Sequence, residues 1–446
     1  MGRAERRGTA VGIALVLAVA LIAGPASGGS WGGGRYKQWV RRIAPGLILR
    51  RIVDYQTPRR IFVLTVDPSK LVTMDVALAQ DQLPGLERTT SMAARHGAIA
   101  AINGDFGSGR PKHAFAEDGD LKQTGGMAAA GFAVTQGEQD VFIGHPQASV
   151  SALEVDSGET WDVARWNKGP PHFGQIVGFT AAGGDLEMPP PFACSARLLP
   201  TGAPQLADPD PGVISPYAVD QTGCSGDPMA PQGGVVLSAQ PTSEEAMLLL
   251  SLSAGETVRI AWSFGGWPGI FDAIGGMPLL VSDGQVALGE CTISFCLRHP
   301  RTGVGVTPEG RLLLVVVGGR QPGYSVGMSL EEFARLFLDL GATFAMNLDG
   351  GGSSTMVVKG KVVNQPSDGT ERLVSSAILV LPGADLGEPA LAAAVAPQGS
   401  RRARLAMLRD GGSLGGLLDE LAQRKLKAGA VGSNPGRRAR YSGAFR

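Results

Sequence analysis

The stretch that decides the fold is ATFAMNLDGGGSSTMVVKG, residues 342–360, in which an apolar run ends in polar residues and glycines. The run is too short for a helix and predicts a buried strand that ends near Asn347 and Asp349. Gly350, Gly351 and Gly352 let the backbone turn sharply and approach a ligand with no side chain in the way. Their N–H groups and the hydroxyls that follow predict an anion nest beside a carboxylate. The same letters also suit a structural tight turn, so this motif alone leaves both interpretations open.

The segment before this strand predicts an amphipathic helix over 329–341. Ser329 is a good N-cap, and Glu332 completes an S-x-x-E capping box. Apolar residues recur from Leu330 at the spacing of one helix face. Gly341 ends the helix in the left-handed position that follows many helices.

Strand signals surround this helix and strand. Residues 301–319 predict two strands joined at 308–310, residues 354–364 predict a hairpin around Gly360, and residues 373–381 predict a last strand. The order is two strands, a helix, a strand, a hairpin and a last strand. It predicts an α+β fold, with helices packed on a mixed β-sheet core.

Composition and the distribution of strand and turn signals divide the rest of the chain into segments. The 446 residues include 65 glycines and 30 prolines, which predict many turns and argue against a helical bundle. Residues 46–135 carry further strand signals, whereas 145–232 are rich in Pro, Gly and Asp and predict an insertion with long loops. The formal net charge of zero gives no reason to expect specific nucleic-acid binding.

Both ends of the chain have a different character. Residues 1–28 combine arginines, an apolar run at 11–23 and small residues, which predicts a secretory signal peptide; an uncleaved membrane anchor is the alternative. Residues 29–45 are Gly-rich and predict a linker. Residues 384–446 predict a basic, largely disordered tail with a short helix near 414–427. The tail suits either a weak contact with an anionic envelope or solvation without a partner.

Export would permit disulfide bonds. The close pair Cys291 and Cys296 predicts a small closed loop, and Cys194 with Cys224 would then bracket the Pro-rich segment. Four free or metal-binding thiols are the alternative, although no CxxC spacing supports zinc. The five histidines also lack metal-ligand spacing, so no metal site is predicted, and the need for a divalent cation stays open.

Further polar residues mark strand ends elsewhere. Asn103 and Asp105 end an apolar run in AINGDFGSG, and Arg301 begins the strand RTGVGV. Arginine at such a position suits a bidentate contact with phosphate or carboxylate. Glu371 and Arg372 precede the last strand, where a surface ion pair is the alternative interpretation.

Several of these blocks together resemble the phosphodiester glycosidase family. The resemblance is close over about 300–381, in RTGVGV, VVVGGR, SLEEFARLFLDLG and NLDGGGSS, and weaker in AINGDF and in GGMPLLVSDG at 275–284. It implies a single catalytic domain over 46–383, with the 145–232 insertion inside it. It also implies hydrolysis of a sugar-1-phosphodiester, of the N-acetylglucosamine-1-phosphodiester type, at the glycosidic bond.

The implied reaction assigns expected roles to the candidate residues. Asp349 is the expected nucleophile or base, and Asp105 and Glu371 are candidates for its partner carboxylate. Arg301 and the glycine-loop amides would hold the departing phosphate. The remaining candidates for substrate binding are Asn103, Asn347, Ser353, Ser354 and Arg372. The two asparagines could instead orient the carboxylates, and capping of strand-end backbone is the alternative interpretation for both.

Three functions are compatible with these residues. The first is an exported glycosidase that acts on a sugar phosphodiester or envelope glycan. The second is an enzyme of the same fold that acts on an ordinary glycoside or an exopolysaccharide. The third is a module that binds an anionic glycan without turnover. No cofactor is expected for any of them, and the expected location is secreted or extracytoplasmic.

Overall fold

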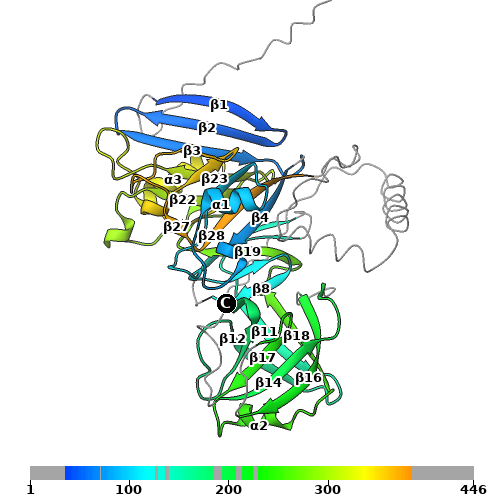
Figure 1. Ribbon diagram of the computed structural model, residues 1–446. Coiled ribbons are helices and arrows are strands. Elements are labelled where there is room, and N and C mark those ends of the chain that lie inside the picture. The colour runs from blue at the N-terminus through cyan, green and yellow to red at the C-terminus, as the bar shows by residue number, and fades with distance from the viewer. Residues whose placement is uncertain are drawn as a thin grey trace, which may run out of the picture.

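A computed structural model describes residues 36–70, 72–125, 129–135, 140–183, 193–206, 213–224 and 230–383. The described chain forms two lobes, which Figure 1 shows one above the other. The signal peptide predicted at 1–28 and the tail predicted at 384–446, with its helix at 414–427, lie outside the described residues. None of the described helices is long and apolar enough to cross a bilayer.

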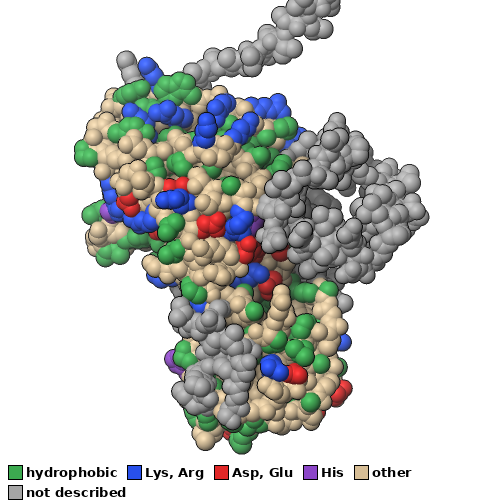
Figure 2. All heavy atoms as spheres, in the orientation of Figure 1, with side chains coloured by type: hydrophobic (Ala, Val, Ile, Leu, Met, Phe, Trp, Pro, Cys, Tyr) green, Lys and Arg blue, Asp and Glu red, His purple; other side chains and the backbone are tan. Residues whose placement is uncertain are grey.

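The upper lobe contains an antiparallel sheet of eight strands in the described part of the chain, in the order β1-β2-β3-β23-β22-β24-β20-β21. These strands are β1 (Tyr36–Ala44), β2 (Leu47–Asp54), β3 (Arg59–Val66), β20 (Leu279–Ser282), β21 (Gln285–Val286), β22 (Arg301–Val306), β23 (Leu312–Val317) and β24 (Phe344–Asn347). Lys and Arg side chains gather on the surface over β1–β3 (Figure 2).

Helix α3 (Leu330–Asp339) covers one face of this sheet. Its Phe333 and Phe337 are fully buried, and their rings meet edge to face with centroids 5.0 Å apart. A Cβ at Gly303 or Gly305 of β22 would lie within 3 Å of these rings. The glycines of RTGVGV therefore make room for the helix, which explains their alternation with buried residues.

Two five-stranded sheets lie on the opposite side of the eight-stranded sheet, over a shared apolar core. The first sheet has the order β26-β25-β6-β28-β4, with β4 (Val72–Leu78), β6 (Ala100–Asn103), β25 (Met356–Val358), β26 (Lys361–Val362) and β28 (Ser376–Pro382). The second has the order β10-β9-β19-β7-β8, with β7 (Phe115–Glu117), β8 (Asp120–Gln123), β9 (Ala130–Thr135), β10 (Val141–Gly144) and β19 (Ile270–Gly276). β5 (Glu87–Arg88) and β27 (Leu373–Val374) form a short strand pair. Helix α1 (Thr89–Arg95) covers the outer face of the first sheet with Met92 and Ala93.

The lower lobe is a β-barrel. Its strands are β11 (Ala148–Glu154), β12 (Thr160–Trp166), β13 (Ile176–Thr180), β14 (Cys194–Pro200), β15 (Gln205–Leu206), β16 (Val213–Gly223), β17 (Val235–Ala239) and β18 (Thr257–Phe264). The order is β14-β17-β13-β12-β11-β18-β16-β15, and β14 also pairs with β16, which closes the sheet. Among the described pairings β12–β13 is parallel, so the fold is mixed. Helix α2 (Glu244–Ser251) packs against β14 and β17 and adds Ala246 and Leu249 to the barrel core.

The local predictions around the opening stretch are confirmed. Ser329 accepts a hydrogen bond from the Glu332 N–H, and the Glu332 side chain accepts from the Ser329 N–H, which completes the capping box. Gly341 has φ of 90°, as a residue in the left-handed region after a helix should. β22 and β23 pair through a turn at 308–310, and β25 and β26 form the hairpin around Gly360. The α+β class is confirmed.

The structure corrects two expectations. Residues 36–44, inside the predicted linker 29–45, form edge strand β1, because the glycines end before Tyr36 and the following residues pair with β2. The described part of the segment 145–232 holds β11 to β16 of the barrel, where long loops were expected. Its prolines are compatible with this: Pro200 ends β14, and Pro216 lies within β16. The two predicted disulfide bonds, Cys194–Cys224 and Cys291–Cys296, are both present.

Candidate active site

The loop after β24 requires its three glycines. Gly351 has φ of 63°, in the left-handed region that favours glycine. A Cβ at Gly350 would lie 2.7 Å from the Pro300 carbonyl oxygen. A Cβ at Gly352 would collide with the side chains of Asp368 and Arg372. The glycines therefore let the loop pass closely between the start of β22 and the segment that precedes β27.

Three amides of this loop donate hydrogen bonds within the protein. The Gly351 N–H donates to the Pro300 carbonyl at 2.9 Å, and the Ser353 and Ser354 N–H groups donate to carbonyls within the loop at 3.2 and 3.3 Å. These bonds form a short 3₁₀ turn, η5 (Gly351–Ser353). These bonds fix the main chain beside Asp349, and the anion nest stays a prediction.

Asp349 is a largely buried carboxylate at the end of β24. Burial raises its pKa above the usual value, and the charge of Asp105 adds to that effect. The Ser353 hydroxyl, the Arg372 charge and the Gly350 N–H act in the opposite direction and favour the ionised form. Asp349 is thus desolvated, as suits a nucleophile or base, yet it has groups that hold its negative charge.

Asp105 lies beside Asp349 and forms a pair with His113. The Asp349 N–H donates to the Gly104 carbonyl at 3.0 Å, which brings the two strand ends together. The Asp105 carboxylate lies 2.8 Å from Nδ1 of His113 and also accepts from the His113 and Phe106 N–H groups. Both side chains are buried, so the carboxylate orients the imidazole as in acid–base pairs. His113 was not among the predicted site residues, because its sequence position carries no motif.

Asn103 and Asn347 hold main chain around this pair. Asn103 Nδ2 donates to the Asp349 carbonyl at 2.7 Å, and its Oδ1 accepts from the Thr302 hydroxyl and the Thr355 N–H. Asn347 Nδ2 donates to the carbonyls of Met277 and Leu348 at 2.7 and 2.8 Å. The amide groups therefore position the strand ends that carry both carboxylates.

The arginines divide into two roles. Arg301 is 2% exposed, and its Nε and Nη2 donate to the carbonyls of Met328, Phe295 and Leu297 at 2.6 to 3.0 Å. Burial, with the nearby charge of Arg320, lowers the pKa of Arg301 to about 10. Arg301 therefore shapes the loop 295–297, whereas the sequence analysis expected it to hold phosphate directly.

Arg320 and Arg372 lie nearer to the glycine loop. Arg320 lies over Gly351, since a Cβ there would be 3.0 Å from Arg320 Nη1, and its guanidinium also contacts His299 at 3.3 Å. In the described part of the chain, neither Arg301 nor Arg320 forms an ion pair with a carboxylate. Arg372 pairs with Asp368 at 2.6 Å and reaches the Ser353 hydroxyl at 3.5 Å. Arg320 was not predicted as a site residue, although it ends the motif VVVGGR.

Two other predicted residues have different surroundings. Glu371 does not join the Asp349–Asp105 pair: its two oxygens accept from the Thr90 N–H at 2.7 Å and the Thr90 hydroxyl at 2.6 Å. It caps the start of α1, where a carboxylate also interacts well with the helix dipole. The Ser354 hydroxyl is buried and makes no hydrogen bond to the described residues, which leaves it available to a ligand.

A cavity of about 340 Å³ lies next to His113, between the sheet of β9 and β19 and the barrel. Small residues and the aromatic rings of Phe132, Phe264 and Trp267 line most of it, and His113 is its one ionisable lining residue among the described residues. His113 and Gln147 are the polar side chains among its described lining residues, and a pocket with a few polar groups among apolar ones is a common form of ligand site.

The fold is shared with solved proteins from bacteria. A hypothetical protein from Synechocystis aligns with a TM-score of 0.60 at 19% identity, over 77% of this chain and 68% of that one. A protein of Burkholderia pseudomallei described as exported aligns with a TM-score of 0.60 at 20% identity, over 78% of this chain and 97% of that one. At such identities the likeness concerns the fold alone.

The sequence comparisons go further for part of the chain. Residues 214–381 match the family described as phosphodiester glycosidase, so the resemblance predicted from the motifs is confirmed. The prophage-derived uncharacterized protein YomE of Bacillus subtilis is 33% identical over 138 residues, which are 30% of this chain and 19% of that protein. N-acetylglucosamine-1-phosphodiester alpha-N-acetylglucosaminidase is 30% identical in Bos taurus and 40% in Mus musculus over 109 residues, 21% of this chain. The chain matches only about a fifth of the length of these relatives.

Proposed function

We propose that the chain is a glycosidase that hydrolyses a sugar-1-phosphodiester at its glycosidic bond. The observation that carries this proposal is a partly buried carboxylate, Asp349, on a loop covered by Arg320, an arginine that has no acidic partner among the described residues. A desolvated carboxylate suits attack at a sugar carbon, and an unpaired arginine suits a phosphate oxygen. The family match at 214–381 includes both residues.

The chemistry needs few groups. The bond from the sugar C1 to the phosphate oxygen breaks, and its electron pair leaves with the phosphate monoester. Asp349 either attacks C1 to form a glycosyl ester that water then hydrolyses, or takes a proton from water that attacks C1 directly; in both cases the products are the free sugar and the monoester. Asp105 holds His113 for proton transfer. Because a phosphate monoester is a good leaving group, the stabilisation of its charge matters more than its protonation.

Arg320 and Arg372 are the proposed phosphate contacts. Arg372 is close enough to Asp349 for its charge to lower that pKa, and Arg320 lies over the intervening glycine loop. Arg301 acts indirectly, through the three carbonyls that it holds. Ser353 and Ser354 would contribute hydroxyl groups beside the same loop.

Export is part of the proposal. Two disulfide bonds suit an oxidising compartment, and a solved protein with the same fold is described as exported. The substrate would then be a sugar phosphodiester or a related glycan outside the cytoplasm.

The test is hydrolysis of UDP-N-acetylglucosamine and of the methyl phosphodiester of N-acetylglucosamine by the full chain. Asp349→Asn should reduce release of free sugar by about a thousandfold or more, since it removes the central carboxylate. Asp339→Asn, at the end of α3, is a matched control and should leave release unchanged. Sugar binding without release by the parent protein would favour a glycan-binding module, and equal release by Asp349→Asn would remove Asp349 from the mechanism.

A further inference from the structure

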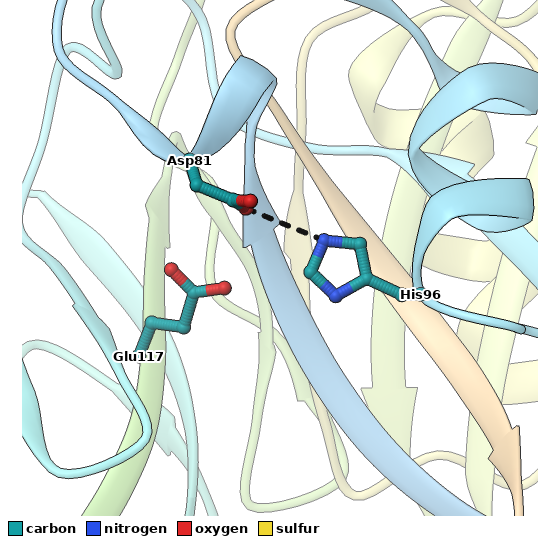
Figure 3. A group of neighbouring side chains, drawn as sticks. All are labelled: Asp81, His96 and Glu117. Atoms are coloured by element: carbon teal, nitrogen blue, oxygen red, sulfur yellow. Dashed lines mark ion pairs between the residues drawn. The ribbon is translucent and has the colours of Figure 1, made fainter. Parts of the chain in front are cut away.

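A cluster of metal-ligating side chains lies outside the proposed active site. Asp81 ends the 3₁₀ turn η1 (Ala79–Asp81), His96 follows α1, and Glu117 is the last residue of β7. One ligand atom from each residue lies within 4.8 Å of the other two. Figure 3 shows the three side chains pointing toward one another from separate segments of the chain.

His96 has an unsatisfied nitrogen in this cluster. Its side chain is 2% exposed, and the buried Nε2 makes no hydrogen bond to any residue in the described part of the chain. Asp81 Oδ1 lies 3.5 Å away, beyond the usual hydrogen-bond range of about 2.7–3.2 Å. Two ligand atoms on a tetrahedral zinc ion with bonds of about 2.1 Å would be about 3.4 Å apart. The spacing of this pair therefore fits two ligands of one ion.

The other oxygen of Asp81 already has a partner. Arg95 Nη1 forms an ion pair with Oδ2, which leaves Oδ1 directed at His96. The Asp81 side chain is 39% exposed, so an ion can reach the cluster from solvent.

Glu117 brings a buried negative charge to the same point. The residue is 6% exposed, and among the described residues no side chain donates a hydrogen bond to its carboxylate or pairs with it directly. A carboxylate at such a position is costly unless a cation neutralises it.

We propose that Asp81 Oδ1, His96 Nε2 and the Glu117 carboxylate bind one divalent transition-metal ion, with Zn²⁺ the best fit. One imidazole and two carboxylates are donors that zinc accepts, whereas calcium and magnesium prefer oxygen ligands alone. Three protein ligands leave a fourth position for water. This site is independent of the proposed hydrolysis.

The bound ion would join three parts of the upper lobe. η1 directly follows β4 of one five-stranded sheet, α1 covers that sheet, and β7 belongs to the other five-stranded sheet. Such a link stabilises the folded state because the unfolded chain offers no preformed site.

The test measures metal content and thermal unfolding of the full chain after dialysis against a chelator and then against Zn²⁺. The parent protein should retain about one zinc per chain, and its Tm should rise with added Zn²⁺. Glu117→Gln and His96→Gln should each weaken zinc binding by at least about tenfold, since ligand loss costs more than loss of a supporting contact. Glu159→Gln and His145→Gln change exposed residues and serve as controls that should bind zinc like the parent.

Glu117→Gln separates metal binding from a purely structural role. In chelator its Tm should equal or exceed that of the parent, because a buried amide costs less than a buried carboxylate. In Zn²⁺ the order should reverse. The proposal is overturned if the parent binds no stoichiometric zinc, if both variants bind it as tightly as the parent, or if Ca²⁺ stabilises the protein while Zn²⁺ does not.

Discussion

Glu371 provides a sharp test of the difference between a catalytic and a structural carboxylate. The structure gives it two hydrogen bonds to Thr90 at the start of α1, at 2.7 and 2.6 Å. A hydrogen bond to a charged group contributes about 1.5–3 kcal/mol. Since Glu371 is only partly buried and water can replace it, we expect Glu371→Ala to destabilise α1 by about 2 kcal/mol. That corresponds to about a thirtyfold change in an opening equilibrium.

Hydrogen exchange followed by mass spectrometry measures the destabilisation of α1 separately from that of the rest of the protein. Amides of α1 should exchange about thirtyfold faster in Glu371→Ala, whereas amides of α3 should be unchanged. Glu331→Ala removes an exposed glutamate that pairs with Arg335, and it should change exchange very little. Turnover by folded Glu371→Ala should stay within a few-fold of the parent. Unchanged exchange at α1 together with a loss of turnover of about a thousandfold would refute this reasoning and return Glu371 to the catalytic residues.

Three more predictions concern charged groups. Because burial raises the pKa of Asp349 and its ionised form is required, kcat/KM should fall with decreasing pH at a value above that of an ordinary aspartate, as a pH–rate profile will show. Arg320→Ala should reduce kcat/KM for a phosphodiester by at least about tenfold more than for a neutral glycoside, while Arg335→Ala affects neither. Burial opposes ionisation of Glu332, but Arg298 and the Ser329 N–H lower its pKa, so its stabilising contribution is present at neutral pH and is lost as pH falls through that lowered pKa. Acid-induced loss of stability, measured by urea unfolding from pH 7 downward, should therefore be smaller in Glu332→Gln.

Local signals in the sequence predicted the region from β22 to β28 well. The capping box of α3, the glycine after it and the turn at 308–310 depend on a few neighbouring residues, so their structures follow from short patterns. The position of Asp349 at a strand end follows in the same way. Asp105 lies beside it because the Asp349 N–H donates to the carbonyl of Gly104, which follows the end of β6.

Long-range contacts explain what the sequence could not show. The barrel depends on pairings such as Ala148 with Phe264, which no local pattern reveals. From the sequence, Arg301 is a candidate to bind phosphate. Its guanidinium instead donates hydrogen bonds to carbonyls of Phe295 and Met328, which no local pattern places beside it. The Asp81, His96 and Glu117 cluster combines three segments, so the ligand spacing that identifies short metal motifs is absent.

The barrel begins and ends at adjacent points of the chain. Its first and last strands, β11 and β18, pair along their length, and the Gly265 N–H donates to the Gln147 carbonyl at 2.9 Å. The chain therefore enters the barrel at residue 148 and leaves it after residue 264 at two adjacent points, so both connections to the upper lobe lie side by side. A single insertion or exchange of gene sequence between these two connections could add or replace the whole barrel. Such a change would not interrupt a strand of the lobe that carries Asp349. The lobe contributes Ala116, Ala133 and Ala273 to the core of the barrel, so a newly acquired unit would have to fit this surface before it became part of the protein.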